Sequence, residues 1–341
     1  MNIYALMYIA VISLFAVMLT IHDKNAARKN ARRIRERTLI IVSIIGGSAA
    51  MLITILAIRH KTRHAKFMVG IPMIIIVQIL IIVFALNSSL SVSYIDIESD
   101  KVDEQIKLAL ITDLHSCDYG DGQRDLIKAV DSENPDAVLL CGDIYDDVLP
   151  PENTTEFIAD ISGKYPCYYV SGNHEFWSGR ADDFKEILEY YGVKVLEGTS
   201  EILKIGSEQI RISGIDDPDT DRYPSRSVFY AEQINRLSNE SADNELFTIL
   251  LSHRPERINE LLPLNPDLVL SGHAHGGQWR LPVLLKNGLL SPNQGLFPKY
   301  TNGEYTFGNT ALIVSRGLAR ESTRLVPRVF NHPEIVVITI K

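Results

Sequence analysis

The sequence predicts an α/β domain that is preceded by two or three transmembrane helices. Three apolar stretches, 3–21, 39–58 and 67–86, each approach the roughly 20 residues that a helix needs to span a bilayer core. Beyond residue 106, short β-rich runs alternate with amphipathic stretches. We therefore expect a transmembrane region over 1–90, a linker over 91–106 and the α/β domain over 107–341.

Charge separates the same two parts. Residues 1–90 contain 11 Lys and Arg against 2 Asp and Glu, a net charge of +9. The whole chain carries −8, so residues 91–341 carry −17. An acidic domain repels nucleic-acid phosphates, which makes nucleic acid an unlikely partner. The three cysteines lie in or beside apolar runs and form no disulfide spacing, so we expect buried free thiols.

The first apolar stretch is predicted to remain in the mature protein. No basic residue precedes it, as one would in a signal peptide, and a basic run follows it instead. Both loops between the stretches are basic, which places both in the cytoplasm. The first loop holds Lys24, Arg28, Lys29, Arg32, Arg33, Arg35 and Arg37, and the second holds Arg59, Lys61, Arg63 and Lys66.

Three full crossings cannot keep both loops on one side. If the middle stretch crosses, the α/β domain is cytoplasmic; if it is re-entrant or shallow, the domain lies outside. Gly46-Gly47-Ser48 would permit a break where protein covers the backbone. Four basic residues precede the third stretch and none follows it until Lys101, so we expect a multi-pass cell-membrane protein with an extracytoplasmic α/β domain.

This region resembles a bacterial membrane family of unknown function, DUF1294, over about residues 1–80. The resemblance implies a membrane module without known chemistry. We expect His60 and His64 to act as interfacial anchors near lipid head groups, with a functional role as the alternative. The matching residues are Asp23-Lys24, Ala26-Ala27-Arg28, Arg33-Ile34, Gly46-Gly47 and His60-Lys61-Thr62.

The α/β domain shows eight predicted strands and five predicted helices, an arrangement typical of sheets covered by helices. The strands are 107–112, 137–141, 167–170, 210–215, 246–251, 267–271, 311–315 and 335–340. The helices are 122–133, 154–162, 181–191, 231–237 and 255–262.

Ligand-type residues follow five of these strands, where α/β sheets place their ligands. Such a set of oxygen and nitrogen donors suits two adjacent divalent ions. The residues are Asp113 and His115, Asp143, Asn173 with His174 and Glu175, His253, and His273 with His275. Gly142, Gly172 and Gly272 directly precede ligands, where we expect positive φ and close backbone approach.

The order Asp-x-His, Gly-Asp, Gly-Asn-His-Glu, His and Gly-His-x-His resembles the calcineurin-like metallophosphoesterase family. The resemblance covers about residues 105–341 and implies a four-layer α/β/β/α sandwich. It also implies that one ion takes Asp113, His115 and His275, that the other takes Asn173, His253 and His273, and that Asp143 bridges them. The metals would be Mn, Fe or Zn, which the ligand set does not distinguish.

In that family a hydroxide between two ions attacks phosphorus, and His174 would protonate the leaving group as general acid. Neighbouring carboxylates leave alternatives open. Glu175 could orient a ligand or form a surface salt bridge. Asp146 and Asp147 could be solvated loop residues or could orient His174.

Further motifs, among them Gly276-Gly277-Gln278, Arg280-Leu281-Pro282 and Ser315-Arg316-Gly317, resemble the membrane-associated branch with YaeI- and YkuE-like phosphodiesterases. This resemblance implies a substrate rim that includes Gln278, Arg280 and Arg316, although Arg316 could equally form a structural ion pair. We expect a membrane-anchored hydrolase of a phosphodiester or pyrophosphate bond, with a phosphorylated small molecule or lipid as substrate. The alternatives are a metal-binding regulatory domain that controls the membrane module, and a nucleotidase or nuclease.

Overall fold

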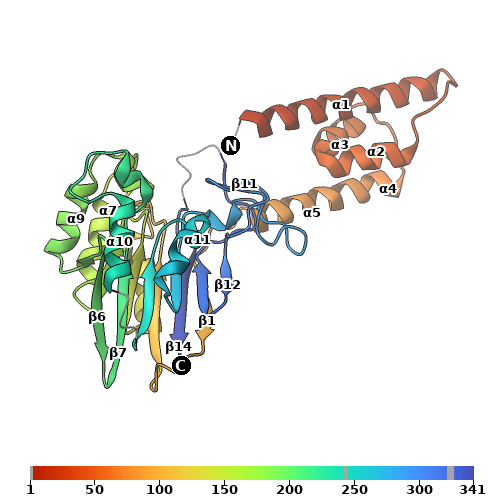
Figure 1. Ribbon diagram of the computed structural model, residues 1–341. Coiled ribbons are helices and arrows are strands. Elements are labelled where there is room, and N and C mark those ends of the chain that lie inside the picture. Colours follow the sequence, from red (N-terminus) through yellow and green to blue (C-terminus); the bar gives the residue numbers. More distant parts are fainter. Residues whose placement is uncertain (1–2, 241–244, 321–325) are drawn as a thin grey trace. The chain divides into compact units, whose positions relative to one another are not determined.

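The computed structural model describes residues 3–240, 245–320 and 326–341 (Figure 1). The chain divides into two compact units, Met1–Leu86 and Asn87–Lys341. After the roles that the sequence predicts for them, we call them the membrane unit and the catalytic unit.

The membrane unit is helical, and three of its stretches are long and apolar enough to cross a membrane: Leu6–Arg28, Glu36–Ala57 and Ala65–Ala85. The predicted apolar helices are thereby confirmed. The elements are α1 (Ile3–Arg28), α2 (Glu36–Val42), the π-helical η1 (Ser43–Gly47), α3 (Ser48–Ala57), α4 (Ala65–Met68) and α5 (Gly70–Ala85).

The middle stretch is broken at Gly46, where φ is 120°. The side chain of Gln78 on α5 donates to the carbonyls of Ser43 (3.0 Å) and Ile44 (2.8 Å) beside the break. These bonds satisfy backbone groups that a break would otherwise leave open in lipid. The chain therefore turns back, and Lys61 Nζ beyond α3 lies 3.2 Å from Glu36 Oε1 at the start of α2.

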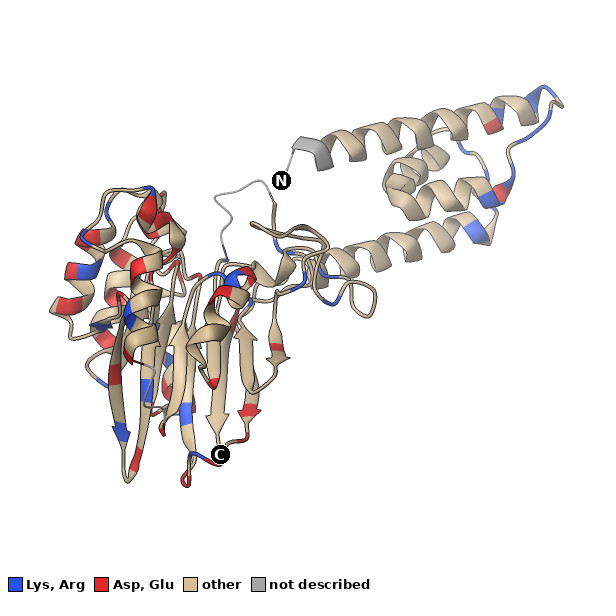
Figure 2. Cartoon of the chain, in the orientation of Figure 1, with Lys and Arg blue, Asp and Glu red and all other residues tan. Residues whose placement is uncertain are grey.

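A buried carboxylate fixes the two loops at this end. Asp23 accepts hydrogen bonds from the backbone N–H of Ile34 (3.0 Å) and from the Arg33 guanidinium (3.3 Å), and pairs with His60 Nε2 (2.8 Å). Lys61 Nζ lies 3.5 Å away. Figure 2 shows the basic residues of the membrane unit gathered at this one end. His60 is thus a buried partner of Asp23, which replaces the predicted interfacial anchor.

The first sheet of the catalytic unit has the order β1-β14-β2-β3-β4-β5. The strands β2 to β5 are parallel, and β14 runs antiparallel to β2. Their bounds are β1 (Ser91–Ile97), β2 (Ile106–Ile111), β3 (Ala137–Cys141), β4 (Cys167–Val170), β5 (Lys194–Val195) and β14 (Glu334–Ile340).

The second sheet has the order β12-β13-β9-β8-β7-β6, with β13, β9, β8 and β7 parallel. A separate hairpin pairs β10 (Leu290–Ser291) with β11 (Gly295–Leu296). The bounds of the sheet strands are β6 (Thr199–Ile205), β7 (Glu208–Gly214), β8 (Phe247–Leu251), β9 (Leu268–Ser271), β12 (Gly303–Phe307) and β13 (Thr310–Val314).

Alternate side chains of a strand point to opposite faces of its sheet. One face of each sheet packs against the other sheet, so the two sheets face each other. Leu108 and Leu110 of β2 pack between the sheets with Ile249 and Leu251 of β8. The outer face of the first sheet packs against α6 (Arg124–Glu133), α7 (Glu152–Ile161) and α9 (Ala181–Tyr190). The outer face of the second packs against α10 (Tyr230–Glu240) and α11 (Ile258–Leu261). This is the predicted four-layer α/β/β/α arrangement (Figure 1).

The segment expected as a linker contains a strand. Residues Ser91–Ile97 form β1, which pairs in parallel with β14. Their alternation Ser-Val-Ser-Tyr-Ile-Asp-Ile is strand-like, but the acidic residues that follow obscure the pattern. The remaining short elements are the helix α8 (Asn173–Trp177) and the 3-10 turns η2 (Asp121–Gln123), η3 (Pro218–Asp221), η4 (Pro255–Arg257), η5 (Leu262–Leu264) and η6 (His275–Gly277).

Candidate metal centre

The predicted ligands come together at the carboxyl ends of the parallel strands. Among the described residues, three groups each place three ligand-type atoms within 4.8 Å of one another; one of them joins His115 with Asp146 and His174, and the other two consist of six buried predicted ligands. The first of these two is Asp113, His115 and His275, and the second is Asp143, His253 and His273. Asp143 lies close to both, because its Oδ2 is 3.0 Å from His253 Nε2 and 3.7 Å from His115 Nε2.

The backbone at this edge is strained. Five ligand residues have φ between 45° and 63°, in the left-handed region that L-residues seldom adopt: Asp113, His115, Asp143, His273 and His275. Each such residue costs on the order of 1 kcal/mol or more. This conformation turns the backbone sharply at the end of each strand and directs the metal-binding side chains toward a common point.

The three glycines that precede ligands differ in backbone conformation. Gly142 has φ of 80°, as predicted. Gly172 has φ of −105°, and Gly272 also lies outside the left-handed region, so the expected positive φ is wrong for both. Both serve close approach instead. A Cβ at Gly172 would lie 2.2 Å from Asp143 Oδ1, and one at Gly272 would lie 2.5 Å from Asp113 Oδ2.

Five buried polar atoms make no hydrogen bond within the described part of the chain, although two of them, Asp143 Oδ2 and His253 Nε2, lie 3.0 Å apart as an ion pair. The five atoms are His115 Nε2, Asp143 Oδ2, Asn173 Oδ1, His253 Nε2 and His273 Nε2. Unpaired buried polar atoms cost on the order of 1–3 kcal/mol each, and native proteins rarely leave them. Imidazole nitrogens, a carboxylate and an amide oxygen are ligands of divalent metals, so the residues fit such ions.

In two of these histidines the other ring nitrogen, Nδ1, has a hydrogen-bond partner. His115 Nδ1 lies 2.9 Å from Asp146 Oδ1, and His253 Nδ1 donates to the carbonyl of Cys141 at 2.9 Å. These contacts fix the ring orientation and leave Nε2 as the ligand atom, as is usual around metals. Asp146 is therefore a buried positioning residue, and its expected alternative as a solvated loop residue is wrong.

Burial and charge set the protonation of the donors. Burial lowers the pKa of His273 and His275 well below the usual value, which keeps both neutral and able to bind metal. Burial also lowers the pKa of His253, but the carboxylates of Asp143, Asp113 and Asp217 together outweigh burial and raise the pKa to about 10. For Asp143, burial raises the pKa, yet His253, His174 and His115 together outweigh burial and lower the pKa well below its usual value.

His174 lies beside the donors but points its Nδ1 at carboxylates. Nδ1 is 2.5 Å from Asp147 Oδ1 and 3.1 Å from Asp146 Oδ1. The backbone N–H of His174 donates to Asp143 Oδ1 at 2.8 Å. Trp177 packs against the ring, with centroids 4.9 Å apart. Asp146 and Asp147 thus orient His174, the sharper of the two roles expected for them.

Glu175 organises the loop that carries Asp143. Its carboxylate accepts hydrogen bonds from four backbone N–H groups at 2.7–3.1 Å: Asp143, Ile144, Tyr145 and Gly172. Burial, followed by the charge of Asp143, raises the pKa of Glu175 to about 7. The side chain is fully buried, so the surface salt bridge considered for it is wrong.

The three predicted rim residues differ in their surroundings. Gln278 has a buried Oε1 without a hydrogen-bond partner among the described residues, and its φ is 53°. Arg280 donates to Asn302 Oδ1 at 2.5 Å. Arg316 pairs with Glu334, which favours the structural ion pair over substrate contact. A substrate role for these residues stays a prediction.

Two arginines near the centre were not predicted. Arg254 donates two hydrogen bonds to the Asp217 carboxylate, at 2.6 and 2.7 Å. Both residues are buried, and Arg254 directly follows His253 in the chain. Arg328 donates to the carbonyl of Arg316 at 2.7 Å, and its guanidinium lies 3.5 Å from His275 Nδ1. Only the position of Arg254 directly after His253 could have indicated its role from sequence.

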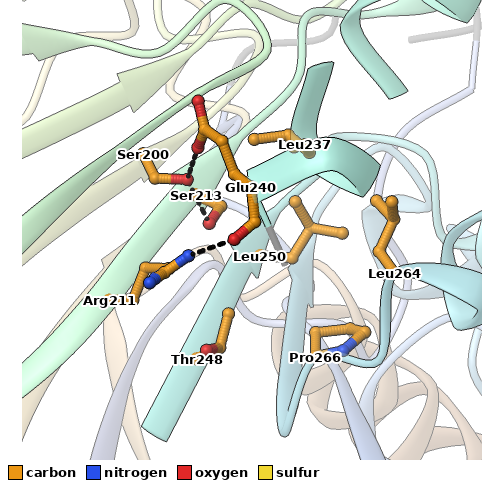
Figure 3. A pocket seen from close by; sticks show the side chains of 9 residues that line it. All are labelled: Ser200, Arg211, Ser213, Leu237, Glu240, Thr248, Leu250, Leu264 and Pro266. Carbon is orange, nitrogen blue, oxygen red and sulfur yellow. Dashed lines mark hydrogen bonds between the residues drawn. The ribbon is translucent and has the colours of Figure 1, made fainter. Parts of the chain in front are cut away.

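A small cavity lies away from the donors, between α10 and the second sheet (Figure 3). Its volume of about 20 Å³ has room for about one water molecule. Arg211 and Ser200 line it and both bond to Glu240, through its carbonyl and its carboxylate. Thr248, at the start of β8, lines it too, so it lies at the strand ends opposite the metal centre.

The calcineurin-like phosphoesterase model matches residues 106–277, which is half of the chain and includes every predicted metal ligand. The chain belongs to this family. The DUF1294 model, described as a protein of unknown function, matches residues 13–67. Members of the calcineurin-like phosphoesterase family are metal-dependent phosphoester hydrolases, so the catalytic unit is a hydrolase domain with a divalent-metal site.

Three curated proteins illustrate the similarity. The uncharacterized metallophosphoesterase YkuE of Bacillus subtilis is 28% identical over 69% of this chain and 79% of its own length. The uncharacterized metallophosphoesterase Cj0846 of Campylobacter jejuni is 27% identical over 89% and 78%. A transmembrane protein with metallophosphoesterase domain from Danio rerio is 26% identical over 69% and 56%.

Proposed function

We propose that the chain is a membrane-anchored phosphoesterase with two divalent ions, which hydrolyses a phosphodiester or pyrophosphate bond. The five unpaired donor atoms around Asp143 carry this proposal. Asp113, His115 and His275 would hold one ion, and Asn173, His253 and His273 the other, with Asp143 shared. Two bound ions supply charge stabilisation at the phosphoryl oxygens and a hydroxide at neutral pH.

His174 is the general acid in this proposal. Asp146 and Asp147 both contact Nδ1, so they hold the ring and favour a proton there. The proton for the leaving oxygen is then carried on Nε2. A positively charged His174 beside two carboxylates is stabilised, which lets the ring hold its proton until the leaving group takes it.

The charges around the centre favour a diester over a terminal phosphate. A terminal monoester carries nearly two negative charges at neutral pH, whereas a diester carries one. Of the arginines close to the centre, Arg254 is neutralised by Asp217 and Arg316 by Glu334, while Arg328 bonds to backbone carbonyls and has no carboxylate partner among the described residues. A substrate with less charge needs fewer additional cations, and a lipid-linked phosphoester at the membrane meets this condition.

We also propose that the catalytic unit is extracytoplasmic. The contact between Glu36 and Lys61 joins the two ends of the middle stretch, which supports a re-entrant segment. The ten residues of α3 rise about 15 Å, half of a bilayer core. Both basic loops then lie on the cytoplasmic side, and α1 and α5 are the crossings. Membrane-impermeant labelling of an added Cys at Tyr190 in intact cells should succeed; protection until lysis would contradict this topology.

Hydrolysis by the full chain tests the activity. After chelation, bis(p-nitrophenyl) phosphate and p-nitrophenyl phosphate would be assayed with and without Mn²⁺. We expect metal-dependent turnover with the diester preferred. No turnover by the metal-loaded chain would favour the regulatory alternative, and a clear preference for nucleotides would favour a nucleotidase.

A further inference from the structure

The catalytic unit exposes a group of large apolar side chains in the segment 279–298, which we call the apolar hairpin. Val283 and Leu284 are 84% and 80% exposed, and Leu296 and Phe297 are each 69% exposed. Trp279 and Leu281 are exposed as well. Single exposed apolar residues are ordinary, but a gathering of six in one segment marks a surface for a partner or a membrane.

The backbone of the apolar hairpin maintains this exposure. The N–H groups of Leu284 and Leu285 both donate to the carbonyl of Leu281, which closes a tight turn at the first exposed pair. Val283 has φ of 70° and Phe297 has φ of 55°, both in the left-handed region. β-Branched and bulky residues rarely adopt this conformation, so both turns are strained. Because these two side chains are exposed, burial does not offset the strain energy.

The charge of this segment is opposite to that of its surroundings. Residues 272–303 contain no Asp or Glu and three cations, Arg280, Lys286 and Lys299, whereas residues 91–341 as a whole carry −17. Lys286 and Lys299 are exposed. Apolar side chains flanked by lysines are the composition of segments that enter the interface of an anionic bilayer, where the lysines meet the head groups.

The apolar hairpin begins at the metal centre. It starts four residues after His275, and its base is fixed by the bond from Leu289 N–H to the carbonyl of Gly277. The chain also enters the catalytic unit at this edge, because Ser91 at the start of β1 pairs with Glu334, next to Arg316. Only residues 86–90 separate α5 from β1, at most about 18 Å of extended chain.

We propose that the apolar hairpin docks the catalytic unit on an anionic lipid surface. Val283, Leu284, Leu296 and Phe297 enter the interface, and Lys286 and Lys299 contact lipid phosphates. Docking places the metal centre within reach of a phosphoester at the bilayer surface. The docking stands on exposure, charge and chain connection alone; its consequence for turnover rests on the proposed function.

Site-directed spin labelling of the full chain tests the docking in vesicles of phosphatidylcholine and phosphatidylglycerol. The three native cysteines are buried, so Leu284→Cys provides a specific labelling site. Tyr190→Cys on α9 is the matched control, because Tyr190 is 84% exposed and Leu284 is 80% exposed. We expect the Leu284 label to favour collisions with oxygen over a nickel chelate, and the Tyr190 label to show the reverse.

Two results would overturn the docking. One is a Leu284 label as accessible to the nickel chelate as the Tyr190 label. The other is dipolar coupling between Leu284 labels that persists on dilution into excess lipid, because a second copy would then cover the hairpin.

Turnover separates the docking from the proposed function. The double variant Leu284→Asp, Phe297→Asp should lose at least tenfold of its activity on a p-nitrophenyl phosphodiester lipid in vesicles. It should retain activity on soluble bis(p-nitrophenyl) phosphate, as should Tyr190→Asp on both. An equal loss on both substrates would contradict docking as the cause. If the wild type cleaves neither substrate, the proposed function fails while the label still decides the docking.

Discussion

The two units of this chain both bury clusters of charged and polar side chains, but they treat them in opposite ways. In the membrane unit, Asp23 is matched by a backbone N–H, an arginine, a histidine and a lysine. In the catalytic unit, donor atoms gathered around Asp143 remain without hydrogen bonds. No side-chain atom of the described membrane unit is buried and unpaired in this way.

The difference separates a structural cluster from a reactive one. A satisfied buried network fixes one arrangement of the chain, here the two basic loops at one end of the membrane unit. An unsatisfied one stores a cost that a ligand can remove, which is how a folded protein keeps a site ready for metal ions. The following variants test this contrast.

The largest effect is expected for Asp143→Asn. The amide keeps the shape of the side chain but removes the charge that both ion positions share. We predict a loss of hydrolysis of roughly 10⁴-fold, because positioning of both ions contributes several kcal/mol to transition-state stabilisation. Turnover of bis(p-nitrophenyl) phosphate measures it. The control Asp160→Asn, on the exposed part of α7, should retain activity; a similar loss there would point to general destabilisation.

Asp23→Ala should affect stability and not chemistry. It leaves His60 buried without its carboxylate and leaves Lys61 with Glu36 alone, which costs about 3–5 kcal/mol. Unfolding of the membrane unit in detergent, followed by protease sensitivity, should occur at lower temperature. The matched variant Glu36→Ala removes a carboxylate that is 40% exposed and should cost under about 1 kcal/mol. Equal effects of the two variants would contradict the structural role of Asp23.

His174→Ala should lower turnover by roughly 100-fold on esters with poor leaving groups, since these need a proton as they depart. On p-nitrophenyl esters the loss should be smaller, because the p-nitrophenolate ion is stable without a proton. The measurement is kcat across a series of phenyl phosphodiesters. A loss that is the same for every leaving group would indicate that His174 acts through the ligands instead.

The smallest effect concerns pH. The raised pKa of His253, about 10, means that this residue holds a proton at neutral pH in the metal-free centre. An ion that binds there must displace it, so affinity should rise by about tenfold per pH unit between pH 6 and 8. Calorimetric titration in buffers with different ionisation enthalpies should detect about one released proton. Affinity that does not change with pH would contradict this.

The sequence predicted the layers of the fold and the metal-ligand residues better than it predicted the residues that hold those ligands in position. Donors follow apolar strands, and strand ends of parallel sheets meet at one edge, so Asp113 and His273 could be placed together despite 160 residues between them. The residues that hold the ligands were harder to predict, because Asp146, Glu175 and Arg254 act through contacts that depend on how loops turn. Strand β1 was missed since its partner β14 lies at the other end of the chain.

Metal stoichiometry of the full chain tests the central claim most directly. Purified protein would be stripped with chelator, titrated with Mn²⁺ and analysed for bound metal after desalting, beside Asp143→Asn and Asp160→Asn. We predict two ions per chain for the wild type and for Asp160→Asn, and fewer than two for Asp143→Asn. One ion or none in the wild type, or two retained by Asp143→Asn, would contradict a shared centre built on Asp143.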